Sequence, residues 1–207
     1  GRVAVHSTIG LGRAHIAPLL GTFSTLHPGV DIELDLSHLP LNIAGTPFDI
    51  AIRVEQLRDS RLQARRLYPN RRVLCAAPSY FGGRPRPTSL ADLSNHHCIV
   101  IRENETDYAI WRFGKDDDET AVRVHGSMIS NDGDIATRWC LEGHGLIMRS
   151  LWQVAPFMRE GALEQVLPDI PTPAADIFAV YPSVSHPPRR ILAALDHLRT
   201  GLAARLA

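Results

Sequence analysis

Apolar and polar residues in the first fifty positions follow the order of an α/β fold. Residues 2–6 alternate small apolar with polar residues and predict a strand. Apolar residues at helical spacing over 16–26 predict a regular helix beginning near His15, with an irregular turn before it. Residues 30–36 alternate apolar and acidic residues, which predicts a strand with one wet face. A brief helix over 41–45 and a buried strand over 48–53 follow. This alternation indicates a parallel sheet that binds ligands at the carboxyl ends of its strands.

The apolar run 73–77, flanked by arginines and closed by Pro78, predicts a buried strand about which the chain is organised. A second α/β pattern follows it. Its expected elements are a helix capped by Thr88 or Ser89, strands over 98–101, 108–113 and 122–128, a helix from Asn131 or Asp132 to Glu142, a strand over 146–148, a short helix from Ser150 towards Glu160, and a strand over 163–167.

The chain is expected to return to its first half. A strand over 176–181 and a helix after Pro187 and Pro188, with one apolar face, complete the pattern. We therefore predict two Rossmann-like α/β subdomains, residues 1–75 with 175–207 and residues 76–174. Two hinge crossings, near Cys75–Ala76 and near Pro173–Ala174, join them.

Composition narrows the classes of function. The 22 basic and 22 acidic residues balance, so this segment lacks the basic surface that DNA binding needs. No apolar run approaches membrane-spanning length and no signal peptide begins the chain, so we expect a cytoplasmic protein without membrane contact. Gly1 begins almost on a strand, which indicates that a preceding domain is missing.

Three cysteines, Cys75, Cys98 and Cys140, lie far apart in apolar segments. An odd number of widely spaced cysteines favours buried, reduced thiols. A redox pair of Cys98 with Cys140 is the alternative, although neither lysine neighbours nor a CxxC spacing support it.

Motifs for enzyme chemistry or a metal are missing. The sequence holds no G-x-S-x-G elbow, no G-x-G-x-x-G after the first strand and no P-loop. Neighbours in the run 96–98 point to opposite faces of a strand, and the acidic run 115–119 lacks the alternate spacing of a calcium loop. We expect no catalysis, no cofactor and no metal.

Several segments together resemble the effector-binding (substrate-binding) domain of LysR-type transcriptional regulators, over residues 1 to about 202. The resemblance rests on Phe-Asp-Ile-Ala-Ile-Arg at 48–53, Arg-Val-Leu-Cys-Ala-Ala-Pro-Ser-Tyr at 72–80, Leu-Ala-Asp-Leu at 90–93, Asn-Asp-Gly at 131–133 and Gly-His-Gly at 143–145. Two departures are the basic Arg149, where the family usually runs apolar residues into a proline, and the apolar entry to the helix at 39–42.

The resemblance implies a fold of the type 2 periplasmic-binding-protein kind, with a small-molecule inducer in the interlobe cleft. It also implies an N-terminal winged helix-turn-helix domain, absent from this chain, through which the intact protein contacts DNA. A homodimer is implied, with the helix after the first strand against the partner's helix after Asn131, and a tetramer when intact. Leu20 and Trp139 are the candidate contact residues. A solute-binding protein of a transporter, with the same fold, is the alternative function.

We expect the effector to be a small carboxylate, such as a hydroxy acid, a dicarboxylate or an aromatic acid. Hydroxyls and N–H groups at a helix N-terminus can hold a carboxylate, and arginine can pair with it bidentately. The alternatives are ordinary helix caps, salt bridges to neighbouring carboxylates and a core tryptophan. The predicted effector-binding residues are Ser7, Thr8, Ile9, Arg53, Arg102, Trp111, Asn131 and Asp132.

Overall fold

A computed structural model describes the chain at residues 1–38, 43, 45–55, 63–102, 108–183 and 186–207. It contains two compact units, Gly1–Pro69 with Asp176–Ala207 (unit 1) and Asn70–Ala175 (unit 2). Most of the brief helix expected over 41–45 lies outside the described residues. The predicted division into two subdomains, residues 1–75 with 175–207 and residues 76–174, stays a prediction.

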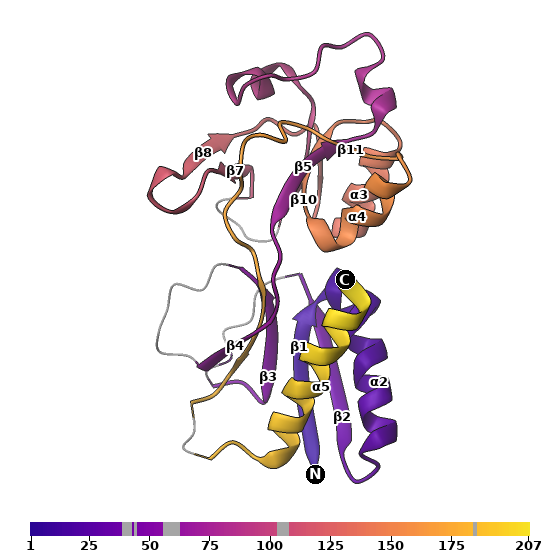
Figure 1. Cartoon of the computed structure of the whole chain (residues 1–207), viewed down its shortest axis with the longest axis vertical. Coiled ribbons are helices and arrows are strands. Elements are labelled where there is room, and N and C mark those ends of the chain that lie inside the picture. Colours follow the sequence, from indigo (N-terminus) through magenta and orange to yellow (C-terminus); the bar gives the residue numbers. More distant parts are fainter. Residues whose placement is uncertain (39–42, 44, 56–62, 103–107, 184–185) are drawn as a thin grey trace. The chain divides into compact units, whose positions relative to one another are not determined.

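Unit 1 is built on a five-stranded mixed sheet in the order β2-β1-β3-β12-β4 (Figure 1). Its strands are β1 (Arg2–Thr8), β2 (Asp31–Ser37), β3 (Ile50–Val54), β4 (Gln63–Tyr68) and β12 (Ile177–Tyr181). β1 pairs in parallel with β2 and β3, as the sequence predicts. The returning strand β12 runs antiparallel to β3 and to β4, an edge strand that the apolar pattern did not predict.

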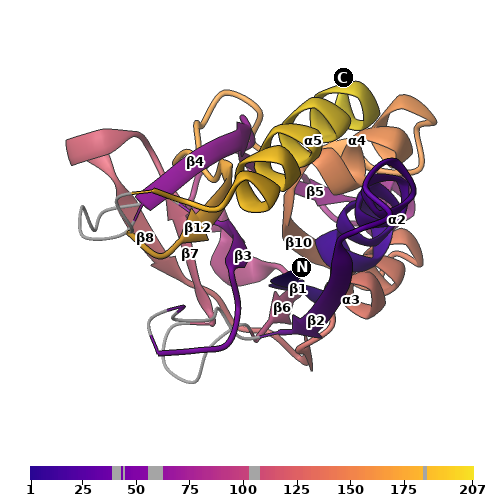
Figure 2. The same ribbon diagram turned by 90° about the horizontal axis from the view of Figure 1, so that it is seen from below.

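Helical structure in unit 1 begins directly after β1, and the regular helix begins at Ala17, within two residues of the predicted start near His15 and after an irregular stretch. It runs as α1 (Ile9–Leu11), the π-helical segment η1 (Gly12–Ile16) and α2 (Ala17–Leu26). Gly12 permits this early start because a β-carbon there would collide with the side chain of Leu36 on β2. The C-terminal helix α5 (Arg189–Leu206) packs beside α2 (Figure 2).

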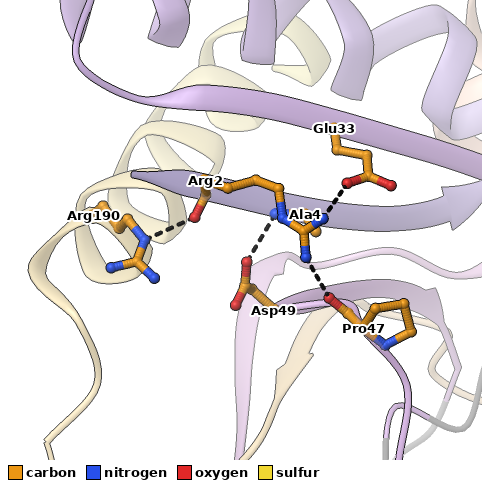
Figure 3. A network of polar contacts seen from close by, with 6 residues as sticks. All are labelled: Arg2, Ala4, Glu33, Pro47, Asp49 and Arg190. Carbon is orange, nitrogen blue, oxygen red and sulfur yellow. Dashed lines mark hydrogen bonds and ion pairs between the residues drawn. The ribbon is translucent and has the colours of Figure 1, made fainter.

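A polar network fixes the amino end of β1 (Figure 3). The Arg190 Nε–H donates to the Arg2 carbonyl at 2.7 Å, and the Arg2 guanidinium pairs with the Glu33 carboxylate at 2.8 Å. The Asp49 carboxylate accepts the Ala4 N–H at 2.8 Å. These bonds tie β1 to α5, β2 and the start of β3, and so hold the register that places the carboxyl ends of the strands.

Unit 2 has a five-stranded sheet in the order β11-β5-β10-β6-β9 and a separate two-stranded sheet, β7-β8. The strands are β5 (Arg72–Ala76), β6 (Cys98–Ile101), β7 (Ile110–Phe113), β8 (Thr120–Arg123), β9 (Met128–Ser130), β10 (Leu146–Ser150) and β11 (Glu164–Gln165). The single strand expected over 122–128 is therefore wrong. Gly126 interrupts it, and a β-carbon there would lie 2.8 Å from the carbonyl oxygen of Cys98.

Short and regular helices complete unit 2. They are the 3₁₀ helices η2 (Pro78–Phe81), η3 (Ala91–Asn95) and η4 (Asp116–Asp118), and the α-helices α3 (Gly133–Leu141) and α4 (Leu151–Arg159). The Asp92 carboxylate accepts the N–H groups of Thr88 and Ser89 at 2.8 and 2.9 Å. The predicted cap is therefore wrong, because the cap position is Leu90, without a side-chain cap, and the helix that follows is a 3₁₀ helix.

The strand β5 lies wholly inside the sheet of unit 2, and four of its residues are buried as predicted. Cys75 pairs with Ile147 and Gln165 on its two neighbours, so bending the chain at Cys75–Ala76 would break both ladders. We therefore move the expected hinges to the steps between the units, after Pro69 and after Ala175.

All three cysteines are buried and free. Cys98 belongs to the core on one face of the unit 2 sheet, whereas Cys75 and Cys140 belong to the core on the other. A redox pair of Cys98 with Cys140 is therefore not supported. Among the described residues, no helix is long and apolar enough to cross a membrane, and no cluster of three potential metal ligands occurs.

Candidate functional site

The carboxyl edge of the unit 1 sheet gathers polar residues from three parallel strands. Thr8 pairs with Ser37 across β1 and β2, and His6 pairs with Ala51 across β1 and β3. Paired residues share a face and alternate residues return to it, so His6, Thr8, Ser37 and Arg53 lie on one face. We call these four residues the unit 1 edge.

Ser7 points to the opposite face, beneath the helix. It is fully buried, and its β-carbon lies 3.3 Å from where a β-carbon at Gly12 would be. The Ser7 Oγ atom has no hydrogen-bond partner within the part of the chain that the structure describes. A buried hydroxyl without a partner is costly, and such an exception in a folded protein calls for an explanation.

The helix that follows begins at Ile9 without a side-chain cap. Thr8 occupies the cap position with an extended backbone, yet its side chain accepts no capping hydrogen bond. The first-turn N–H groups, from Ile9 onward, therefore have no partner inside the helix. Together with the helix dipole, such groups favour an anion. Ordinary capping by Ser7 or Thr8, the alternative expected from sequence, does not occur here.

Arg53 forms a salt bridge with Glu55. Its Nε atom lies 2.7 Å from Oε1 of Glu55, and its Nη2 atom lies 3.3 Å from Oε2. The Arg53 side chain is 20% exposed, so the pair is partly shielded from water. The structure thus contains the salt-bridge alternative for Arg53. Because a guanidinium carries five N–H donors, this pair leaves others with which Arg53 can hold an anion.

Unit 2 brings Arg102 and Asn131 to one edge of its own sheet. They directly follow β6 and β9, whose last residues Ile101 and Ser130 are paired in parallel. The Arg102 N–H donates to the Ser130 carbonyl at 2.8 Å, and both Arg102 and Asn131 are exposed. They are therefore free to meet a ligand at the carboxyl edge, where α/β sheets bind their ligands.

Asp132, and not Asn131, caps α3. Its Oδ1 atom accepts the N–H groups of Asp134 at 2.8 Å and Ile135 at 3.2 Å. Such a cap contributes about 1 kcal/mol to stability. Asp132 therefore has a structural role that accounts for its position, and Asn131 is the better candidate for ligand contact.

Trp111 is a core residue. Its side chain is 6% exposed and belongs to the apolar cluster that includes Tyr80 and Phe113. The alternative of a packed tryptophan on an edge strand is thus the one that the structure supports. The Trp111 indole therefore stabilises unit 2 and is too buried to form an aromatic wall of a ligand site.

Sequence reasoning missed His6 and Ser37 as site residues. The His6 Nε2 atom lies 2.9 Å from the Ser37 Oγ atom, and the imidazole is 4% exposed. Burial lowers the pKa of His6, while the charge of Asp35 opposes that shift. The signal available in the sequence was alternation, because His6 lies two residues before Thr8 on the same strand.

Arg149 lies beside the first turn of α3. Its guanidinium lies 2.6 to 2.8 Å from where a β-carbon at Gly133 would be, so glycine is needed for this close packing. Arg149, which replaces the apolar residues usual in the family, therefore places a cation against the N-terminus of α3. The apolar lining usual in the family is absent at this position.

Two α/β units, joined by two chain crossings and each with polar residues at the carboxyl ends of parallel strands, define a two-lobed ligand-binding domain of the periplasmic-binding-protein type. The sequence model of the LysR substrate binding domain matches residues 1–203. The chain belongs to this family.

Relatives with transcriptional functions share most of the chain. The HTH-type transcriptional activator TtdR of Escherichia coli (strain K12) is 36% identical over 181 residues, which are 87% of this chain and 58% of that protein. The HTH-type transcriptional regulator DmlR of the same strain is 33% identical over 183 residues, 88% of this chain and 59% of that protein. The chain thus spans less than two thirds of these relatives.

Solved structures give the same fold. The regulatory domain of CrgA from Neisseria meningitidis superposes with a TM-score of 0.77 at 27% identity, covering 97% of this chain and 98% of that one. A full-length AphB variant superposes with a TM-score of 0.80 at 24% identity, covering 98% and 69%. The relatives are transcriptional regulators and not enzymes, and they lend no support to the alternative of a transporter's solute-binding protein.

Proposed function

We propose that this chain is the effector-sensing domain of a cytoplasmic LysR-type regulator and that it binds a small organic acid at the unit 1 edge. The observation that carries the proposal is the helix that begins at Ile9 without a cap, at the same end of β1 as Thr8 and its register partner Ser37. A carboxylate held there would give the first-turn N–H groups a partner.

The donor groups of the site favour a carboxylate over a neutral ligand. First-turn N–H groups, the Thr8 and Ser37 hydroxyls and the Arg53 guanidinium are donors on adjoining elements. Hydrogen bonds to a charged group contribute about 1.5–3 kcal/mol each, so each donor that reaches the carboxylate should raise the affinity about tenfold or more.

Arg102 and Asn131 are the further contacts that we propose for the effector in unit 2. Both sit at the ends of parallel strands, and neither side chain has a hydrogen bond among those described. An acid with a second polar group would use them.

The DNA-binding step belongs to the intact protein. The relatives are HTH-type regulators longer than this chain, so we propose that a helix-turn-helix domain outside this segment contacts DNA. An effector can control that domain by binding one arrangement of the assembly more tightly than another.

We also propose a homodimer through α2 and α3, within a tetramer of the intact protein. Leu20, expected at this contact, is 2% exposed and belongs to the core of unit 1, so it is unavailable. The exposed apolar residues on these helices are Leu26 on α2 and Ile135 on α3, at 66% and 46%. Light scattering at micromolar concentration should therefore give a dimer mass, and a Leu26→Ser/Ile135→Ser variant a monomer mass.

Calorimetric titration with malate, succinate and benzoate tests the ligand proposal, because these acids represent the three expected classes. At least one should bind wild type, and Arg53→Ala should weaken that binding about tenfold, or about 1.4 kcal/mol. The matched control is Arg123→Ala, an exposed arginine on β8. Equal binding to wild type and Arg53→Ala would remove Arg53 from the site.

One further variant separates two causes of weakening. Arg53→Ala leaves the Glu55 carboxylate without its partner, and that charge alone would repel an acid. In Arg53→Ala/Glu55→Ala the repulsion is gone. If the double variant binds as wild type does, Arg53 serves only to neutralise Glu55, whereas persistent weakening supports direct contact.

A further inference from the structure

We infer that the effector is an aromatic monocarboxylic acid, whose ring lies on Phe178 while its carboxylate is held at the unit 1 edge. The inference rests on the proposed carboxylate site and deepens it by choosing one of the three expected classes of acid. It also gives the site an aromatic wall, because Trp111, the residue expected in that role, lies in the core of unit 2.

The row of residues at the unit 1 edge continues across the sheet beyond Arg53. Continuing the register of β1 with β3 by two residues places Thr8 opposite Arg53. In the pairing of β12 with its two neighbours, Phe178 lies opposite both Arg53 and Arg66. Paired residues share a face, so one face carries, in order from β1 to β4, a threonine, an arginine, a phenylalanine and an arginine.

Phe178 is the apolar member of this row. On the same face, Ala51 and Val180 are packed into a core cluster with Ile43. Phe178 is only half-buried, so part of its ring is exposed at the carboxyl end of β3. Neighbouring strands lie about 4.8 Å apart, so an acid whose carboxylate meets Arg53 can bring its ring onto Phe178. Aromatic rings in contact attract one another beyond the effect of burying apolar area.

Both arginines of the row already pair with a carboxylate of the chain. The Arg53 Nε atom lies 2.7 Å from Oε1 of Glu55, and the Arg66 Nη1 atom lies 3.4 Å from Oδ2 of Asp176. The Glu55 N–H donates to the Asp176 carbonyl at 3.2 Å, so the two acidic residues are neighbours on adjoining strands. Their ion pairs with the two arginines indicate that both carboxylates lie on the face that carries Phe178.

These carboxylates decide between the classes of acid. A short diacid held at Arg53 would carry its second carboxylate onto Phe178 and towards Glu55 and Asp176. Like charges repel it there, and the phenylalanine ring offers no hydrogen-bond donor, so this arrangement discriminates against a diacid. An aromatic ring at the same place carries no charge and contacts Phe178. We therefore expect benzoate to bind more tightly than succinate or malate.

Calorimetric titration with the three acids tests this preference. Wild type should bind benzoate about tenfold more tightly than succinate and malate. Phe178→Ala should weaken benzoate binding about tenfold and leave succinate binding unchanged, because only benzoate loses a ring contact. The matched control is Tyr181→Ala, at a half-buried aromatic residue of β12 whose side chain points to the opposite face, and it should bind benzoate as wild type does.

A second variant gives the row what a diacid needs. Phe178→Lys introduces an ammonium beside Arg53, so it should raise the affinity for succinate about tenfold and remove the preference for benzoate. Thermal unfolding of each variant confirms that the domain is folded.

Nuclear Overhauser contacts between benzoate and wild type test the position of the ring without any substitution. With labelled phenylalanine side chains, we expect contacts from the benzoate ring protons to the ring protons of Phe178. Contacts with other phenylalanines in place of Phe178 would overturn the inference, even if a Phe178 variant failed to fold.

The outcomes separate this inference from the proposed function. If succinate or malate binds wild type as tightly as benzoate, or if Phe178→Ala binds benzoate as wild type does, the aromatic class is wrong while the carboxylate site stands. If none of the three acids binds wild type, the proposed site fails and the inference fails with it.

Discussion

The side-chain amide of Asn70 donates to the carbonyl of Ala175 at 2.9 Å, and the Ala175 N–H donates to the carbonyl of Asn70 at 3.0 Å. The same side chain reaches Ser150 Oγ at 3.2 Å and accepts the Trp152 N–H at 3.4 Å. One residue thus ties both crossings of unit 2 to the start of α4.

Replacing Asn70 should destabilise unit 2. Asn70→Ala removes the side-chain bonds to Ala175, Ser150 and Trp152, so we expect the free energy of unfolding to fall by about 1–3 kcal/mol. Urea unfolding measures this change. Asn95→Ala, at an exposed asparagine of η3, should change it by less than about 0.5 kcal/mol. Equal effects of the two variants would show that Asn70 is not the tie we describe.

Two helical glycines should respond in opposite directions to alanine. Nothing lies within 4 Å of a β-carbon at Gly21 of α2, whereas one at Gly201 of α5 would collide with Leu19. Gly21→Ala should therefore stabilise the chain by about 1 kcal/mol through helix propensity alone. Gly201→Ala should lose that gain and destabilise it by about 1–3 kcal/mol through overpacking. Thermal unfolding compares them, and two shifts of the same sign would contradict the α2–α5 packing.

Acid should weaken the fold between pH 7.5 and 5.5. Burial lowers the pKa values of His6, His15 and His96 from the ordinary value of 6.5. Below pH 6.5 the unfolded chain therefore binds more protons than the folded one, so stability falls as the pH falls. At His96 burial is the main cause of the lowered pKa, and the positive charge of Arg84 adds to it.

Urea unfolding at the two pH values measures this dependence, and a single variant assigns part of it. His96→Gln should reduce the difference in unfolding free energy between pH 7.5 and 5.5. His125→Gln, at an exposed histidine, should leave that difference unchanged. A fold that is equally stable at both pH values would contradict the account of these buried rings.

The thiols should be inert in the folded chain. Burial raises the pKa of Cys98 to about 12. The pKa of Cys140 is raised by the hydrogen bond between Cys140 and the Cys75 side chain, and by burial. At pH 8 a thiol of pKa about 12 is ionised in roughly one molecule in ten thousand, and the thiolate is the reactive form. We expect a disulfide reagent to modify the three cysteines only in urea. Rapid modification of the native chain would contradict their burial.

Local patterns predicted the elements whose residues bury a face of their own. The apolar stripe of α5, the buried run of β5 and the capping role of Asp132 follow from spacing within one segment. The strand β4 was missed because its Gln-Ala-Arg-Arg start carries no apolar alternation and depends on pairing with β12. The stretch before α2 was expected only as an irregular turn, because Gly12 is typical of a loop until Leu36 is packed against it.

The candidate site was predictable only in part. Thr8 and Arg53 follow from the rule that ligands meet the carboxyl ends of parallel strands, and both lie on the unit 1 edge. The bond between His6 and Ser37 joins residues far apart in the sequence, so it depends on a register that no local pattern specifies. Likewise, Trp111 could be assigned to the core only once its neighbours were known.

Amide chemical-shift mapping of the ¹⁵N-labelled chain during titration with malate, succinate and benzoate tests the central claim most directly. The account predicts saturable shifts of the Thr8, Ile9 and Gly10 amides with at least one acid, because those groups would donate to its carboxylate. The amides of β8, in the separate two-stranded sheet of unit 2, should move little. Saturable shifts elsewhere in the chain, with Thr8, Ile9 and Gly10 unmoved, would contradict the account.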